Sequence, residues 1–137
     1  TYLANRLANL LKTVYKVKNL QLGILDITFY RDDFRRRDTP LSAEANKMDF
    51  LIEGKKVVII DDVLYSGRSV RAALTAMQSY GRPDNIELLV LIDRRFSRHL
   101  PIQPDYRGRQ VDAINKERVL VTWVENDNKD AVYIEAK

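Results

Sequence analysis

Two adjacent carboxylates, Asp61 and Asp62, stand between a short apolar run and a loop rich in serine and glycine. The run, residues 57–60, consists of four β-branched apolar residues and is typical of a buried strand. A helical pattern follows the loop, and the N-terminus of a helix offers backbone N–H groups and a favourable dipole to a phosphate. Carboxylates beside such a site suit hydroxyl groups or Mg²⁺. This combination, at the carboxyl end of a strand, predicts a cradle for a phosphorylated sugar.

The two carboxylates and the loop also have simpler interpretations. Adjacent strand residues point to opposite faces, so Asp61 and Asp62 can share a ligand only if the strand ends there, as the loop suggests. An acid at a strand end also occurs in P-loop proteins, but no GxxxxGK[ST] motif is present. Ser66 alone could be an ordinary helix N-cap beside a turn glycine. Taken together with the apolar run, however, the loop favours ligand binding.

The composition indicates one globular domain, whose excess of positive charge suits either an anionic ligand or an ordinary solvated surface. The chain has 137 residues, 45% hydrophobic and 31% charged, with a net charge of +4. It contains no cysteine and one histidine, which excludes a disulfide framework and makes a histidine-based relay unexpected. It has no apolar run of about 18 residues, so no membrane span is predicted. No signal-peptide pattern is visible, and we expect a cytoplasmic location.

Strand and helix patterns alternate along the chain. The first helix is marked by apolar residues at helical spacing, namely Leu3, Leu7, Leu10, Leu11 and Val14. A second helix is expected over residues 70–80, ended by Gly81 and Pro83. Strands are expected over residues 22–30, 57–60, 86–92, 118–125 and 131–135, the last two joined as a hairpin by a turn at 126–128. The order predicts an α/β fold, a mostly parallel sheet flanked by helices with an antiparallel edge.

The segment DDVLYSGRSVRAAL, residues 61–74, resembles the phosphoribosyl pyrophosphate (PRPP) signature of type I phosphoribosyltransferases. The chain is similar over nearly its whole length to the PyrR-type family, which comprises pyrimidine-operon RNA attenuators that are also uracil phosphoribosyltransferases. Further matching segments are residues 2–4, 6–8, 25–33, 81–83, 90–94, 100–102, 105–106 and 117–119. The resemblance implies Mg²⁺-dependent transfer of ribose 5-phosphate from PRPP to uracil, giving UMP and pyrophosphate. It also implies an mRNA leader as a second partner and a homodimer or higher homo-oligomer.

The resemblance assigns roles to particular residues. Asp61 and Asp62 would handle the ribose hydroxyls and the Mg²⁺-bound sugar. The 5′-phosphate would be held by a continuous segment, namely Leu64, Tyr65, Ser66, Gly67, Arg68 and Ser69. The base would be bound by Asp93, Arg94 and the backbone at Val111. Residues 31–56 would form a flexible flap with Arg31 at its hinge and part of the catalytic set; plain solvated charge is the alternative for this hinge.

Two departures from the family pattern shape our expectations. The family has a strand and a pyrophosphate-binding Thr-Arg-Gly turn before the segment that matches Tyr2, so we expect residues 1–137 to be a single domain truncated at its N-terminus, without that strand. After Arg94 the family reads Gly-His-Arg-Glu-Leu-Pro, whereas residues 95–101 here are one residue longer, and Gln103 replaces an arginine. That region contacts RNA in the family, so we expect weaker or less specific RNA binding. The alternatives are an RNA-binding nucleotide sensor with little catalysis, or a transferase for another base.

Overall fold

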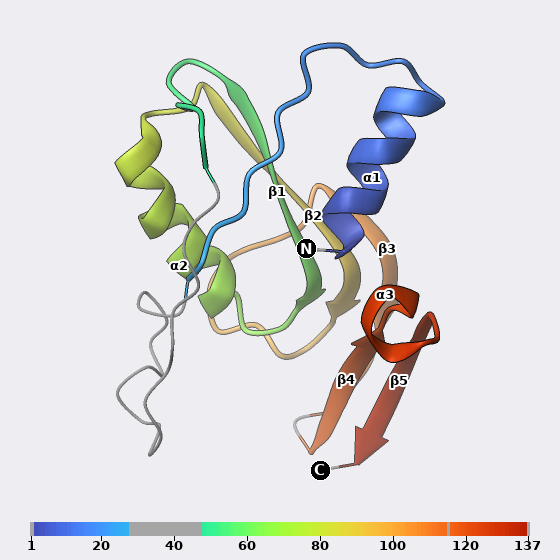
Figure 1. The fold of residues 1–137 in the computed structure, drawn as a ribbon. Helices are drawn as coiled ribbons and strands as arrows, with labels where there is room; N and C mark the ends of the chain where they lie inside the picture. The colour runs from blue at the N-terminus through green and yellow to red at the C-terminus, as the bar shows by residue number, and fades with distance from the viewer. Residues whose placement is uncertain (1, 28–47, 115, 137) are drawn as a thin grey trace.

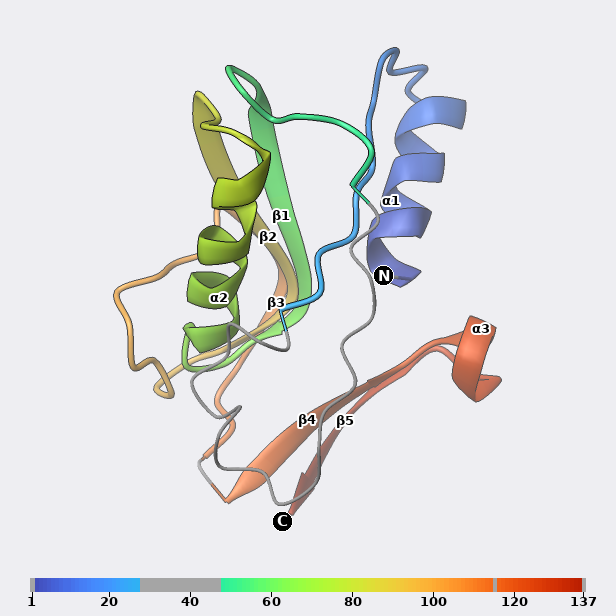
Figure 2. The same cartoon turned by 60° about the vertical axis from the view of Figure 1, so that its left-hand side comes forward.

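The computed structural model describes residues 2–27, 48–114 and 116–136, which form an α/β fold. In chain order the elements are α1 (Tyr2–Thr13), β1 (Lys56–Leu64), α2 (Arg68–Met77), the 3₁₀ helix η3 (Gln78–Tyr80), β2 (Asn85–Arg94), β3 (Tyr106–Val111), β4 (Glu117–Thr122), α3 (Val124–Asp127) and β5 (Ala131–Ala136). α2 covers one face of the β1-β2-β3 sheet and α1 lies on the other (Figures 1 and 2). The β4-β5 hairpin lies beyond the carboxyl ends of β1 and β2.

The central sheet is parallel, which confirms the predicted fold class. β2 lies in the middle, with Ile59 of β1 aligned with Leu88 and Asp61 aligned with Val90. One hydrophobic cluster joins the sheet to α2, and its members are Leu64, Val70, Leu88 and Val90, with Ile59 and Ile102 packed against them. Because the strands are parallel, their carboxyl ends meet at one edge, where ligands of such sheets bind.

The predicted end of the second helix is confirmed. α2 passes into η3, which stops at Gly81 with φ of 119°. A Cβ atom at Gly81 would lie 2.9 Å from the backbone nitrogen of Glu53, closer than a Cβ can pack. Both the left-handed backbone and this close approach require glycine at the end of the helix.

Three strand predictions differ from the structure. β1 does not end at Ile60 but continues through both aspartates to Leu64, because the ladder with β2 continues to Asp93. The strand expected over residues 22–30 is absent from its described part, where only Ile24 makes an isolated bridge. β3 was not expected, since its sequence YRGRQV is polar and mostly exposed. It forms through parallel pairing with β2, and this tertiary interaction cannot be predicted from the local pattern of apolar residues.

The hairpin is confirmed, but its placement differs from the prediction. β4 and β5 pair antiparallel with Val119 opposite Ile134, and they form a separate two-stranded sheet rather than an edge of the parallel one. The strand ends at Thr122, and the connection contains the short helix α3 in place of a tight turn. The side chain of Asp127 accepts a hydrogen bond from the backbone N–H of Trp123 at 2.9 Å, which stabilises this turn of helix.

α1 is amphipathic as predicted, but only part of its apolar face is covered. Leu3 and Ala8 are buried, whereas Leu10 is 46% exposed and Val14, just beyond the helix, is 62% exposed. In the described segments, no helix has the length and apolar character needed to cross a membrane.

Candidate active site at the carboxyl edge of the parallel sheet

The structure gathers the predicted site residues at one edge of the sheet. The last residue of β1, Leu64, is aligned with Asp93 near the end of β2. Arg94, the last residue of β2, is aligned with Val111, the last residue of β3. The residues predicted for the phosphate loop and those predicted for the base pocket therefore lie close together in space, although up to about fifty residues separate them along the chain. Arg31 and the other residues of the predicted flap up to 47 lie outside the described residues.

The two carboxylates point to opposite faces of β1, contrary to the expectation that the strand ends before them. Asp61 is two residues after Ile59 and therefore points to the same face of the strand, the face on which Ile59 packs against the cluster beneath α2. Asp62 lies on the other face, where its Oδ2 accepts a hydrogen bond from Trp123 Nε1 at 3.3 Å. The backbone N–H of Asp62 donates to Asp61 Oδ1 at 2.8 Å, so the Asp61 side chain is bonded locally. Each aspartate thus has its own surroundings.

The loop between β1 and α2 leads through a glycine directly into the N-terminus of α2. Gly67 precedes α2 with φ of 94°, a conformation that favours glycine. A Cβ atom there would also lie 3.3 Å from side-chain atoms of Leu100 and Ile102. The helix-capping position is therefore Gly67 and not Ser66, although Ser66 Oγ accepts a hydrogen bond from the Arg68 N–H at 3.3 Å. The first turn of α2 carries no acidic side chain, which leaves its positive end available to an anion.

The segment 99–102 holds this loop from outside. The carbonyl of Ser66 accepts hydrogen bonds from the N–H groups of His99 at 2.9 Å and Leu100 at 3.1 Å. Ser66 is accordingly buried. The loop is thus tied to the region that departs most from the family pattern, which the sequence did not indicate.

A buried charged cluster occupies the end of β2. Asp93 is fully buried, and its Oδ1 accepts a hydrogen bond from Arg98 Nη2 at 2.7 Å. Arg98 also donates to the Tyr65 carbonyl at 2.7 Å, while Arg107 Nη1 lies 3.6 Å from Asp93 Oδ2. Arg94 is buried as well, lying 4.2 Å over the Tyr65 ring. The predicted base-binding residues are therefore linked directly to the predicted phosphate loop.

Several polar atoms of this cluster have no hydrogen-bond partner among the described residues. They are Asp93 Oδ2, Arg94 Nε, Ser97 Oγ and Arg98 Nε. Buried polar atoms are nearly always paired in folded proteins, so such a group is explained best by a ligand or an ordered water. One acceptor and three donors at one strand end can recognise a small polar heterocycle.

Sequence reasoning missed Arg98, Arg6 and the contact of Trp123 with Asp62. Trp123 is 8% exposed and contacts a site residue. The only available signal was that a buried indole N–H usually finds an acceptor, without any indication of which one.

The described residues contain no group of three or more His, Cys, Asp or Glu side chains arranged to hold a metal ion. Mg²⁺ commonly binds through one or two carboxylates together with the phosphates of a substrate. Asp61 and Asp62, each on its own face of β1 before the predicted phosphate loop, supply single carboxylates of the kind that contact a metal ion arriving with its substrate.

Comparison with known proteins agrees with this geometry. Residues 1–126 match the family model described as the phosphoribosyl transferase domain. A bifunctional protein PyrR from Halalkalibacterium halodurans is 46% identical over 138 residues, covering 99% of this chain and 76% of that protein. Another, from Gloeothece citriformis, is 47% identical over 130 residues, covering 95% and 72%. A solved hypoxanthine phosphoribosyl transferase from Trypanosoma cruzi, 19% identical with a TM-score of 0.50, covers 69% of this chain and 48% of that one, and shows the fold alone.

The fold and the site define a type I phosphoribosyltransferase, an α/β enzyme class with its ligand site at the carboxyl ends of parallel strands. The chain belongs to the phosphoribosyl transferase domain family and, within it, to the bifunctional PyrR proteins.

Proposed function

We propose that this protein transfers the 5-phosphoribosyl group from PRPP to uracil, producing UMP and pyrophosphate. The observation that supports it most is the meeting of three features at one sheet edge: two adjacent carboxylates, one on each face of β1, a loop that leads into a helix N-terminus, and a buried polar cluster with atoms that lack a hydrogen-bond partner among the described residues. These features correspond to the ribose, the phosphate and the base of one nucleotide. Arg31 and the flap residues 31–56 keep the roles that the family resemblance implies.

The residues would act mainly by positioning and by electrostatic stabilisation. In the transfer, the bond from ribose C1 to pyrophosphate breaks, the electron pair leaves with pyrophosphate, and uracil N1 forms the new bond and loses its proton. Backbone N–H groups of Gly67, Arg68 and Ser69 would hold the 5′-phosphate, and Asp61 and Asp62 would bind the ribose hydroxyls. Their negative charge also favours the positive charge that develops on the ribose. Mg²⁺ bound to PRPP supplies neutralisation of the leaving pyrophosphate.

The buried cluster suits uracil chemically. Uracil presents two carbonyl acceptors and an imide N–H donor at N3. Asp93 Oδ2 is an acceptor with only the 3.6 Å ion pair to Arg107, and Arg94 Nε and Arg98 Nε are donors without a hydrogen-bond partner in the described part of the chain. The Val111 carbonyl accepts the Arg95 N–H at 2.8 Å, and its second lone pair can accept a donor of the base. We therefore propose that the side chains and the Val111 carbonyl contact the base together.

The test is UMP formation from PRPP and uracil with Mg²⁺, compared with the double variant Asp61→Asn/Asp62→Asn. Loss of a hydrogen bond to a charged group costs about 1.5–3 kcal/mol, so each substitution should weaken Mg²⁺-dependent PRPP binding measurably by calorimetry. Hypoxanthine and guanine in place of uracil test the base. A folded double variant with unchanged PRPP affinity would refute the role of the carboxylates, and equal turnover of a purine would refute the choice of uracil.

A second function, binding to a pyrimidine-operon mRNA leader, is favoured by one exposed aromatic side chain. Phe96 is 79% exposed with φ of 70°, and the Arg95 guanidinium lies 4.4 Å over its ring. Single-stranded RNA is commonly bound by stacking of bases on such groups. Arg98 lies inward on Asp93 and contributes little to this surface. We therefore propose that positive charge attracts RNA to this surface, that one base stacks on Phe96, and that the surface distinguishes RNA sequences only weakly.

We also propose that the protein forms a homodimer or higher homo-oligomer. In and just after α1, Leu10, Leu11, Val14, Tyr15 and Val17 are exposed together. Exposed apolar clusters commonly mark protein–protein contacts. Light scattering after size-exclusion chromatography tests this, with a monomer over the working concentration range as the contradicting result.

A further inference from the structure

Asp62 is held by a residue from a distant part of the chain. Its Oδ2 accepts a hydrogen bond from the indole Nε1 of Trp123 at 3.3 Å, across a separation of 61 residues. Trp123 follows β4 directly and is 8% exposed. An indole N–H can only donate, so it binds one oxygen of the Asp62 side chain and leaves the second oxygen for another donor.

The backbone of Trp123 is itself held on both sides. Its N–H donates to Asp127 Oδ2 at 2.9 Å, and its carbonyl accepts the N–H groups of Asn126 at 3.0 Å and Asp127 at 2.7 Å. The N–H of the next residue, Val124, donates to Asp130 Oδ1 at 2.7 Å. The short helix α3 thus serves to orient the tryptophan at its start.

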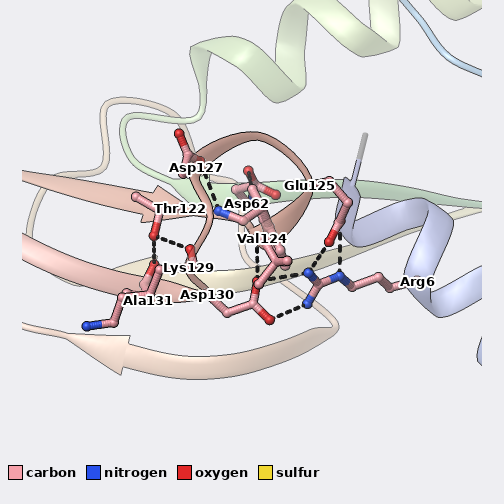
Figure 3. Close-up of polar contacts among 10 residues, drawn as sticks. Arg6, Asp62, Thr122, Val124, Glu125, Asp127, Lys129, Asp130 and Ala131 are labelled. Atoms are coloured by element: carbon pink, nitrogen blue, oxygen red, sulfur yellow. Dashed lines mark hydrogen bonds and ion pairs between the residues drawn. The ribbon is translucent and has the colours of Figure 1, made fainter.

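Arg6 of α1 lies over the ring of Trp123. Its guanidinium carbon lies 4.9 Å from the ring centroid, a cation–π contact. The same group donates two hydrogen bonds of 2.8 Å to Asp130 and also pairs with Glu125 (Figure 3). Arg6 lowers the pKa of Asp130 to about 2 and also lowers that of Glu125, while its own pKa is raised by both carboxylates. All three groups therefore stay charged at neutral pH.

We propose that Trp123 is a positioning residue for Asp62, and that Arg6, Glu125 and Asp130 hold Trp123 in place. We call these three the hairpin clamp. The inference rests on the proposed function, in which Asp62 accepts from a ribose hydroxyl. A carboxylate on a strand rotates about two side-chain bonds, and fixing one oxygen aims the other at the ligand before it arrives. The clamp joins α1, the hairpin and the PRPP signature into one unit at the site.

The alternative is that Trp123 and the clamp only stabilise the fold. A purely structural role would change the affinity for every ligand of the site in the same proportion. A positioning role changes the preference for ligands with ribose hydroxyls over ligands without them. The ratio of affinities for UMP and 2′,3′-dideoxy-UMP therefore separates the two roles.

The experiment uses calorimetry with both nucleotides on the wild type and three variants. Trp123→Phe keeps an aromatic ring beneath Arg6 but lacks the N–H. Arg6→Met removes the clamp cation. Arg118→Met is the matched control, because it breaks the exposed 2.8 Å ion pair to Glu135 in the same hairpin without touching the clamp. We expect the preference for UMP to fall about tenfold in Trp123→Phe, the low end for a hydrogen bond to a charged group. It should fall less in Arg6→Met and not at all in Arg118→Met.

The outcomes separate this inference from the proposed function. If the wild type prefers UMP and Trp123→Phe keeps that preference, the positioning role is refuted and the proposed function stands. If the wild type shows no preference, the assignment of Asp62 to a ribose hydroxyl is refuted, and the positioning role with it.

A measurement on the wild type covers the case in which Trp123→Phe does not fold. Trp123 is the sole tryptophan in the chain, so a ¹⁵N-labelled sample gives one indole N–H resonance. We expect this resonance to move on addition of UMP and to move much less with 2′,3′-dideoxy-UMP. Equal movement with both nucleotides, or none with either, would overturn the positioning role.

Discussion

Replacing Arg98 with methionine should destabilise the protein strongly, because it leaves Asp93 buried without its main partner. Asp93 is fully buried, and Arg98, with a side chain 17% exposed, donates to it at 2.7 Å. Removing one partner of a buried ion pair typically costs about 3–5 kcal/mol. Arg107 stays 3.6 Å from the other carboxylate oxygen and gives partial compensation, so we expect a loss near the lower end, about 3 kcal/mol.

The matched control lies three residues away. Arg95 pairs with Asp112 at 2.8 Å, but both side chains are about half exposed. Surface pairs of this kind contribute less than about 1 kcal/mol, so Arg95→Met should be nearly neutral. For a domain of this size, a difference of about 3 kcal/mol corresponds to roughly 10 °C in melting temperature. Urea denaturation and calorimetry of both variants measure the contrast.

A second substitution tests the cause of the loss. Asp93→Asn removes the charge with little change in shape, so adding it to Arg98→Met should recover part of the lost stability. The coupling energy of the double-mutant cycle then reports the ion pair. If Arg98→Met loses no more stability than Arg95→Met, the buried pair does not stabilise the fold and the reasoning is wrong.

Three further predictions concern the phosphate loop, the hairpin clamp and RNA. Gly67→Val should weaken UMP binding far more than uracil binding in calorimetry, because φ of 94° and the 3.3 Å approach to Ile102 strain any side chain there; equal losses would argue against a phosphate loop. Asp130 has its pKa lowered from 3.8 to about 2, so its stabilisation is complete above about pH 4 and is lost as pH falls towards 2. The stability difference between wild type and Asp130→Asn should therefore shrink over that window, and a constant difference in acid titrations would contradict it. A cognate operon hairpin and a scrambled one should bind similarly and lose affinity steeply with salt, whereas a hundredfold preference for the cognate hairpin near physiological salt would show specific readout.

Local sequence patterns were sufficient for the elements that bury their own apolar residues. The apolar run at 57–60 and the run at 86–92 each predicted a strand, because buried parallel strands need continuous apolar sequence. Gly81 predicted the end of the second helix, because only glycine accepts its backbone angle and its approach to Glu53. The loop between β1 and α2 was predictable for the same reason, since its glycine and the helix that follows are local features.

The relation between the two aspartates was decided by tertiary structure. The sequence placed Asp61 and Asp62 beside the loop but suggested that the strand ended before them. Pairing with β2 extends β1 to Leu64, and the alternation of strand side chains then sends the carboxylates to opposite faces. The length of a strand depends on how far its neighbouring strand continues, and the local sequence pattern carries no information about that neighbour.

By itself, the sequence determined the class of the fold, the position of the loop between β1 and α2 and the identity of the charged residues around it. Only the tertiary structure determined which charges meet. Arg6 and Glu125 are 119 residues apart, and Arg98 is one of several arginines in its region, so spacing gives no reason to pair them with their partners. Ion pairs and hydrogen bonds act over a few ångströms, and the distances between these groups are set by the packing of the sheet, α1 and the hairpin.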